Sequence, residues 1–221
     1  DMLAMVEDDY YPVECSDQAF FLNAGIVFDA NEVQEHIEEH AVPHSAALLA
    51  RVRETQSPYF TGALARVNAS WQNLGQNAKV AAAKAGLRPP EANPFMNNVA
   101  QAVEIVDALD RCADLCRKLA EPGAIASSSL PVPFEVKAGR AVGFTEAPRG
   151  ALFHDLTLDA EGRVTHASIL TPTAQNVANL EADMRLLAEK LVADGAAEDV
   201  VRLEIGKLVR AYDPCLSCSV H

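Results

Sequence analysis

The chain has 221 residues, with 18 lysines and arginines against 31 aspartates and glutamates, and a formal net charge of −13. Such an acidic chain has no excess of cationic side chains to neutralise phosphates, which excludes nucleic acids and anionic membrane surfaces as expected partners. Its 49% hydrophobic and 22% charged residues are typical of a folded protein and exclude intrinsic disorder.

The cysteines and the N-terminal residues indicate a cellular compartment. An odd number of cysteines, five in all, in a chain long enough to fold without disulfides indicates a reducing environment. Residues 1–9 contain neither a basic region nor a sustained apolar run, so they do not form a secretory signal. No stretch reaches the roughly 18 apolar residues of a membrane-spanning helix. Because the first residue is not methionine, we expect the N-terminus to be a cut or trimmed end.

The first part of the chain is predicted to be helical. Residues 31–56 are interpreted as two short helices, with Asn31 as the N-cap and Pro43 as the break between them. Residues 60–87 are interpreted as one long alanine-rich helix that ends at Gly86.

A second long helix is predicted to begin at Asn93-Pro94 and to end before Pro122. Its apolar residues recur three or four positions apart, as in a helix with one buried face, and are Val99, Val103, Val106, Leu109, Ala113 and Cys116. Cys112 and Cys116 are therefore expected to be small buried hydrophobic residues, and Cys15 is interpreted in the same way. Residues 127–133 are expected to form an irregular connection.

The helical period is lost after residue 133. Short alternating runs over residues 134–136, 152–158 and 164–170, with a turn at 159–162, predict β-hairpins. Two further helices are predicted over about 175–193 and 198–209.

These elements define an α+β fold class that is mainly helical. A long-helix bundle over residues 1–133 is expected to precede a small hairpin-rich β segment over residues 134–174. Residues 175–221 are expected to form helices and a C-terminal metal-binding tail.

The C-terminal tail carries a Cys-x-x-Cys pair, Cys215 and Cys218, followed by His221. Two thiolates at this spacing can bind one metal ion or form a redox pair, and the imidazole is a further ligand. The spacing alone leaves three interpretations open, namely part of a metal site, a redox pair and a purely structural pair.

A histidine-rich segment offers a weaker alternative. His36, Glu39 and His40 match the His-x-x-Glu-His pattern of some zinc peptidases, with His44 four residues further on. Because short patterns of this kind are common on acidic surfaces, the preferred interpretation is an exposed acidic helix.

Several segments, in the same order along the chain, resemble one known family. They are Tyr59-Phe60-x-Gly62-x-Leu64-Ala65-Arg66-x-Asn68, Asn93-Pro94-Phe95, Glu146-Ala147-Pro148-Arg149-Gly150, Pro172-Thr173-x-Gln175-Asn176 and Asp213-Pro214-Cys215-x-x-Cys218-x-x-His221. Together they resemble the large subunit of nickel-iron hydrogenases over about residues 40–221. Gln175, where many membrane-bound members have tryptophan, makes the chain similar to the cytoplasmic, multimeric branch, which transfers electrons to nicotinamide, deazaflavin or heterodisulfide-linked carriers.

The resemblance implies a nickel-iron centre with cyanide and carbon monoxide ligands, held by four thiolates. By position, Cys215 would be a terminal nickel ligand and Cys218 a ligand that bridges nickel and iron. Arg149 would lie over the open metal position, with Asp213 as its counter-charge.

The resemblance also implies contacts around that centre. Pro148, Pro172 and Thr173 would contact the diatomic ligands. His221 and the backbone carbonyl of Ile169 would bind a magnesium ion.

One feature of the family is missing from the sequence. The Arg-x-Cys-Gly-x-Cys motif that supplies the other two thiolates does not occur in these residues, nor do the neighbouring proton-relay glutamate and the acidic magnesium ligand. We therefore expect the other cysteine pair on another chain or on a missing N-terminal half, and we expect a chain that ends at His221 to be the matured product of C-terminal processing. Further partners implied are an iron-sulfur small subunit and an electron-accepting module that uses NAD(P) or deazaflavin.

The expected activity is the reversible heterolytic cleavage of H2 in a cytoplasmic hydrogenase of several subunits, to which this chain contributes the C-terminal part of the large subunit over residues 1–221. Two alternatives remain open. One is a non-catalytic hydrogenase-like scaffold subunit, and the other is a stand-alone protein with a zinc-binding or redox-active tail.

Overall fold

The computed structural model describes residues 1–13, 16–121 and 133–220. Predictions about Cys15, His221 and most of the connection over residues 127–133 therefore lie outside the described residues. The α-helices are α1 (Val33–His36), α2 (Ala63–Ser70), α3 (Gln76–Lys84), α4 (Asn97–Leu119), α5 (Pro172–Ala193) and α6 (Glu198–Tyr212). The 3-10 turns are η1 (Ala30–Glu32), η2 (Trp71–Asn73), η3 (Pro94–Met96) and η4 (Leu216–Ser219). The strands are β1 (Met2–Met5), β2 (Gln18–Phe21), β3 (Ile26–Asp29), β4 (Ile37–Val42), β5 (Ser45–Val52), β6 (Phe60–Thr61), β7 (Gly139–Ala147), β8 (Gly150–Leu158) and β9 (Val164–Leu170).

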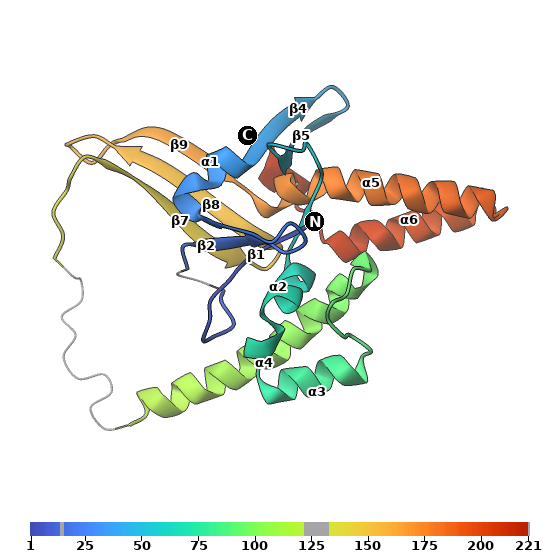
Figure 1. Cartoon of the computed structure of the whole chain (residues 1–221), viewed down its shortest axis with the longest axis horizontal. Coiled ribbons are helices and arrows are strands. Elements are labelled where there is room, and N and C mark those ends of the chain that lie inside the picture. The colour runs from blue at the N-terminus through green and yellow to red at the C-terminus, as the bar shows by residue number, and fades with distance from the viewer. Residues whose placement is uncertain (14–15, 122–132, 221) are drawn as a thin grey trace.

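The described strands form three sheets (Figure 1). The first has the order β3-β2-β1-β6, in which β1 and β6 are parallel and the other pairs are antiparallel. The second is the β4-β5 hairpin, and the third is the antiparallel sheet β7-β8-β9.

A shared hydrophobic cluster joins the first sheet to the third. Leu3 and Phe21 of the first sheet and Phe144 and Phe153 of the third belong to this cluster. The Phe144 and Phe153 rings stack with their centroids 4.2 Å apart. This packing fixes the β7-β8 hairpin against β1, because burying aromatic rings contributes a large part of core stability.

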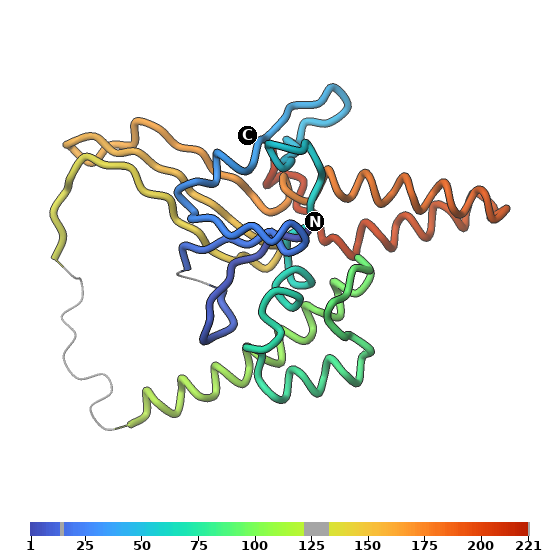
Figure 2. The backbone as a smooth tube through the Cα atoms, viewed as in Figure 1, coloured from blue at the N-terminus to red at the C-terminus, as the bar shows by residue number. Residues whose placement is uncertain are grey.

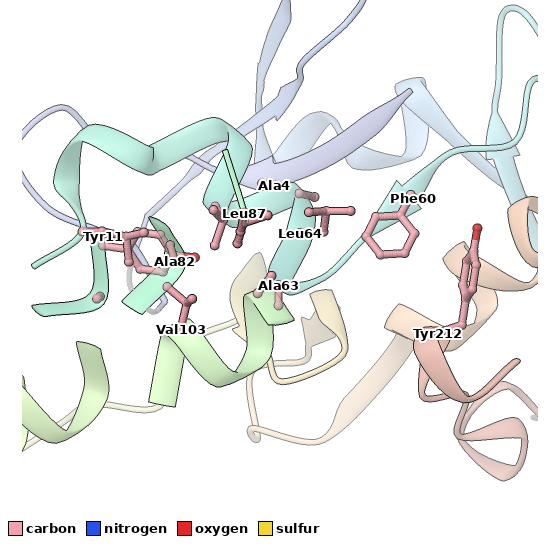
Figure 3. Close-up of a cluster of buried hydrophobic side chains, with 14 of the residues drawn as sticks. Ala4, Tyr11, Phe60, Ala63, Leu64, Ala82, Leu87, Val103 and Tyr212 are labelled. Atoms are coloured by element: carbon pink, nitrogen blue, oxygen red, sulfur yellow. The ribbon is translucent and has the colours of Figure 1, made fainter. Parts of the chain in front are cut away.

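A second hydrophobic cluster joins the helices to one another (Figure 3). It contains side chains from α2, α3, α4, α5 and α6, among them Leu64 and Val103. Phe60 of β6 meets Tyr212, the last residue of α6, edge to face at a centroid distance of 5.3 Å. The end of α6, where the tail begins, is thereby anchored to the strand that precedes α2.

The structure confirms the mixed α+β class and the predicted elements in the second half of the chain. The helix expected after Asn93-Pro94 is α4, and the last two predicted helices are α5 and α6. The β segment forms the three antiparallel strands β7, β8 and β9. No helix in the described part of the chain is long and apolar enough to cross a membrane.

The prediction of a helical region over residues 1–133 was wrong for its first half. The described part of residues 1–29 contains three strands, and the expected helices over 31–56 are one short turn of helix followed by the β4-β5 hairpin. Val42 pairs with Ser45, so Pro43 lies in a tight turn rather than between two helices. A proline fits either position, because it lacks an N–H and fixes its own φ.

The β4-β5 hairpin also separates the two histidines of the His-x-x-Glu-His pattern into different elements. His36 ends α1 and stacks on Phe28 with a centroid distance of 4.2 Å, whereas His40 lies on β4. Two histidines four apart share a face only within one helix, so the pattern does not form the metal-binding face that it forms in zinc peptidases.

Two helix predictions need correction further along the chain. The single helix expected over 60–87 is interrupted between α2 and α3, where Gly75 donates its N–H to Asp107 at 2.7 Å. Cys112 and Cys116 are exposed rather than buried, because all the buried residues of α4 come before residue 108.

Candidate active site

The Glu146–Gly150 segment forms the tight turn that joins β7 to β8. Ala147 pairs with Gly150, and Pro148 and Arg149 are the two turn residues. Gly150 has φ +134°, and a Cβ atom there would lie 2.5 Å from the side chain of Thr61. Only glycine fits this position, and the close approach fixes the turn against β6.

Asn176 ties the same turn to the start of α5. Its amide exchanges two hydrogen bonds with the backbone of Thr61, since Oδ1 accepts from the N–H at 2.9 Å and Nδ2 donates to the carbonyl at 2.9 Å. Nδ2 also donates to the carbonyl of Arg149 at 3.3 Å. Gln175 is fully buried and donates to the carbonyl of Ala151 at 2.5 Å. The two amides therefore position the turn and contribute no exposed chemistry.

Arg66 on α2 is the buried centre of a charged network beneath the turn. Its guanidinium donates to both carboxylate oxygens of Glu104 at 2.6 and 2.7 Å and to Glu146 at 2.9 Å. It also donates to the carbonyls of Ala147 at 2.9 Å and Pro148 at 3.2 Å. A fully buried charge is tolerated only when it is paired and hydrogen-bonded in this way.

The partners of Arg66 are themselves held in place. Glu146 accepts from the N–H of Met5 at 2.8 Å, and burial raises the pKa of this carboxyl above its ordinary value. Tyr11 donates to Glu104 at 2.5 Å, and burial raises the pKa of its phenol well above the usual range, with the charge of Glu104 adding to the effect. Glu104 was not predicted from the sequence. The sequence signal for such a partner was Arg66 itself, because an arginine on a predicted apolar helix needs a buried carboxylate as its counter-charge.

The tail that follows α6 meets the turn through Arg149. Asp213 caps α6 in the left-handed conformation at φ +48°, which redirects the chain. Arg149 Nε donates to the backbone carbonyl of Asp213 at 2.6 Å, and Nη2 donates to its carboxylate at 3.1 Å. The side chains are 41% and 42% exposed, so the ion pair lies at the surface of the described residues.

The cysteine pair follows two residues after Asp213. The N–H of Cys215 donates to the hydroxyl of Thr173 at 3.1 Å, and Thr173 lies in the first turn of α5 after Pro172. Cys215 and Cys218 are joined by a disulfide, with the N–H of Cys218 donating to the carbonyl of Cys215 at 2.9 Å. Cys215 is partly buried, and Cys218 is exposed.

The cysteine pair fits part of a soft-metal site. Two sulfurs that lie close enough to bond to each other can bind one ion once they are reduced to thiolates. Within the described residues no group of three or more histidine, cysteine, aspartate or glutamate side chains could hold a metal ion. The described residues therefore supply two sulfur donors at this position, fewer than the four of a complete structural metal site.

The expected magnesium ligands are only partly described. Ile169 lies on β9 opposite His154, two residues before the N-cap of α5 at Thr171. His221 lies outside the described residues, so the pairing of its imidazole with the Ile169 carbonyl stays a prediction.

An open cavity of about 500 Å³ lies beside the ion pair. Its lining includes Pro148 of the turn and Asp213 of the tail, together with Ile105 and Ala108 of α4. Arg66 and its carboxylate partners also line this cavity. The cavity thus connects the turn that carries Arg149 with the exposed part of α4.

Comparison with known proteins identifies the family. A family model described as nickel-dependent hydrogenase matches residues 53–221, and the chain belongs to this family. Sulfhydrogenase 1 subunit alpha of Pyrococcus furiosus is 38% identical over 204 residues, which cover 89% of this chain and 44% of that protein. The NAD-reducing hydrogenase HoxS subunit beta of Cupriavidus necator is 34% identical over 127 residues, which cover 56% of this chain and 25% of that protein.

Solved structures agree on the fold. The crystal structure of NAD+-reducing [NiFe]-hydrogenase in the H2-reduced state matches with a TM-score of 0.78 at 22% identity, over 99% of this chain and 50% of that one. The Ni-Fe-Se hydrogenase from Desulfomicrobium baculatum matches with a TM-score of 0.57 at 21% identity, over 92% and 47%. The chain therefore spans about half the length of the relatives that it matches, and the family inferred from the sequence motifs is confirmed.

Proposed function

We propose that this chain is one half of the catalytic large subunit of a nickel-iron hydrogenase that cleaves H2 heterolytically and reversibly. The observation that carries the proposal is the convergence of three motif segments. The turn with Arg149, the first turn of α5 with Thr173 and the tail with Cys215 are joined by hydrogen bonds to Asp213 and to the Thr173 hydroxyl.

Cys215 and Cys218 would supply two of the four thiolates of the centre, Cys215 to nickel and Cys218 between nickel and iron. The disulfide that joins them here would have to be reduced first, because only thiolates bind the metals. When bound, the nickel-iron centre with its cyanide and carbon monoxide ligands supplies the redox-active site at which the H–H bond is broken.

Arg149 would polarise dihydrogen or accept its proton at the open metal position. Its guanidinium is held by two hydrogen bonds to Asp213, and further N–H donors remain on the same group to face the site. A planar cation fixed in this way stabilises developing negative charge without having to reorganise during the reaction.

The surrounding residues would shape the site. Pro148 and Pro172 would contact the diatomic ligands and exclude water, and the Thr173 hydroxyl would donate to cyanide while it accepts from the N–H of Cys215. His221 and the carbonyl of Ile169 would hold a magnesium ion that fixes the tail.

Partners are required for the full activity. The other thiolates would come from the half of the large subunit that this chain does not span, whether on the same polypeptide or on another. Electrons would leave through an iron-sulfur small subunit to an electron-accepting module that uses NAD(P), deazaflavin or a similar carrier. Relatives that are named as sulfhydrogenase and NAD-reducing hydrogenase subunits support an assembly of several subunits. We place this assembly in the cytoplasm as part of the same proposal.

Replacement of one thiolate tests this proposal. In the purified complex that contains this chain, Cys215→Ser should abolish nickel retention and H2-dependent dye reduction together. Cys112→Ser is the matched control, since Cys112 is an exposed thiol on α4 and should leave both unchanged. If Cys215→Ser kept nickel at full occupancy, the ligand assignment would be wrong.

A non-catalytic scaffold subunit is the second candidate. It is favoured by the observation that no group of three or more histidine, cysteine, aspartate or glutamate side chains in the described residues could hold a metal ion. A purified complex with iron-sulfur signals but no nickel would support this candidate instead.

A further inference from the structure

A single buried side chain, that of Arg66, holds the backbone of the turn that carries Arg149. Nη1 of Arg66 donates to the carbonyl of Ala147 at 2.9 Å, and Nη2 donates to the carbonyl of Pro148 at 3.2 Å. These two carbonyls directly precede Arg149 in the turn. Because a side chain leaves the backbone in a direction that the local backbone conformation sets, a shift of these carbonyls would also redirect the side chain of Arg149.

Glu104 of α4 fixes the plane of the Arg66 guanidinium. Oε1 of Glu104 accepts from Nε at 2.6 Å, and Oε2 accepts from Nη2 at 2.7 Å, so the pair is bidentate. The hydroxyl of Tyr11 donates to the same Oε1 at 2.5 Å and restricts the carboxylate in turn. The side chains of Arg66 and Glu104 are only 4% and 18% exposed. Water therefore screens this pair little, and the guanidinium is held in one orientation.

Helix α2, which carries Arg66, connects this contact to the tail as well. It lies between the β7–β8 turn and α4 (Figure 2). Asn97 is buried at the start of α4, where its Oδ1 accepts from the N–H of Leu64 at 3.1 Å and its Nδ2 donates to the carbonyl of Ala211 at 2.7 Å. Ala211 comes shortly before Asp213, the hydrogen-bond partner of Arg149. Contacts of α2 and its neighbours thus fix the turn and the tail relative to each other.

The side chain of Arg149 depends on this support, because it lies at the surface of the described residues. It is 41% exposed, whereas Arg66 is 4% exposed. A long side chain in contact with solvent samples several rotamers unless its backbone and its partner are both fixed. Asp213 supplies the partner, and Arg66 fixes the backbone. A displacement of a reacting group by about 1 Å can slow a reaction about 100-fold.

We propose that Arg66, held by Glu104, is a positioning residue for Arg149. It fixes the two carbonyls before Arg149 and so directs the guanidinium toward the open metal position, without touching the reacting atoms itself. The Arg66–Glu104 pair therefore determines the rate of H2 cleavage and not only the stability of the fold. This inference rests on the proposed function, because Arg149 acts on dihydrogen only where the metal centre is bound.

Glu104→Gln tests the proposal with little change in side-chain size. It replaces one acceptor of the bidentate pair by an amide nitrogen, which cannot accept from Arg66. Asp155→Asn is the matched control, because Asp155 is 5% exposed and accepts from Arg140 with two contacts of 2.8 Å, on β8 opposite Val142 and away from the turn. Both substitutions weaken a buried carboxylate–arginine pair of the same β7–β8 and α4 framework.

Steady-state kinetics of the purified hydrogenase complex separate the two variants. Glu104→Gln should lower kcat for H2 oxidation at least about tenfold, with KM for H2 and nickel content unchanged. Asp155→Asn should leave kcat, KM and nickel content unchanged. Equal kcat values in the two variants would overturn the inference, because they would show that the Arg66–Glu104 pair has a structural role alone.

A double substitution tests whether Glu104 acts through Arg149. When Glu104→Gln is added to Arg149→Lys, kcat should fall no further than in Arg149→Lys alone, since residues that act as a unit are not additive. A further loss by the same factor as in the otherwise unaltered enzyme would show that Glu104 acts independently of Arg149, and would overturn the inference.

Amide hydrogen exchange of the peptide over residues 146–151 reports on the turn without requiring activity. Exchange should be at least about tenfold faster in Glu104→Gln than in Asp155→Asn, because the turn loses its fixed support. Equal exchange rates would overturn the inference. A complex in which the turn loosens as expected but which contains no nickel would refute the proposed function alone. An active, nickel-containing complex in which Glu104→Gln has a normal kcat would refute the positioning role alone.

Discussion

Replacing Arg149 by lysine keeps the positive charge but removes the planar guanidinium, which makes two hydrogen bonds to Asp213. In the structure the guanidinium donates to the backbone carbonyl of Asp213 through Nε and to its carboxylate through Nη2. An ammonium group is a single charge on a flexible stem and cannot make both contacts in one fixed plane. Arg149→Lys therefore tests the position of the charge rather than its presence.

The structure predicts different magnitudes for stability and for rate. Because both side chains of the pair are about two-fifths exposed, solvent screens the interaction, and the loss of unfolding free energy should stay below about 1 kcal/mol. A fixed cation that acts on developing charge contributes much more, so H2 oxidation should slow by at least about 100-fold, or about 2.7 kcal/mol. Nickel content should not change.

The assay compares H2-dependent dye reduction and nickel content in purified complexes. Arg140→Lys is the matched control, because Arg140 is 44% exposed and forks to Asp155 with two contacts of 2.8 Å, on β7 well before the turn. The control should retain full activity. If Arg149→Lys were as active as the control, the role assigned to Arg149 would be refuted.

Three further predictions concern the support of the site. Arg66→Lys should lower the unfolding free energy by about 3 kcal/mol in urea titrations, because Glu104 and Glu146 lose the guanidinium that pairs with both of them. An unchanged urea midpoint of unfolding would contradict this expectation. Gly150→Ala should cost about 3 kcal/mol, because φ is +134° and the Cβ would collide, whereas Gly143→Ala, with no atom within 4 Å, should be nearly neutral. Burial raises the pKa of Tyr212, so above about pH 10 the unfolded chain loses this proton first and stability falls as the pH rises. Tyr212→Phe should therefore reduce the alkaline loss of stability measured between pH 8 and 11, to which the buried Tyr11 also contributes, and an unaltered slope would show that Tyr212 does not contribute to it.

The long helices were predictable because their start signals and apolar periods agree. Helix α5 begins at Pro172, with Thr171 as N-cap, and α4 follows Asn93-Pro94. The strands over residues 37–52 were not predictable in the same way, because a short apolar run of this length is compatible with either helix or strand. Their pairing depends on contacts with α5, which lies more than a hundred residues away in the sequence.

The site was predictable as motifs but not as a network. The segments around Arg149, Thr173 and Cys215 were identified from their residue order, and the structure brings them together. The buried pairs of Arg66 with Glu104 and Glu146 join residues 38 and 80 positions apart, and local patterns carry no information about such pairs. The exposure of Cys112 and Cys116 was missed for a related reason, since an apolar period identifies a packing face without identifying the partner.

Metal analysis combined with infrared spectroscopy of the purified complex tests the central proposal most directly. A centre held in part by Cys215 and Cys218 predicts nickel together with iron, and infrared bands of cyanide and carbon monoxide that disappear in Cys215→Ser. Zinc alone, or iron-sulfur clusters without nickel and without those bands, would contradict the assignment of this chain to a catalytic hydrogenase subunit.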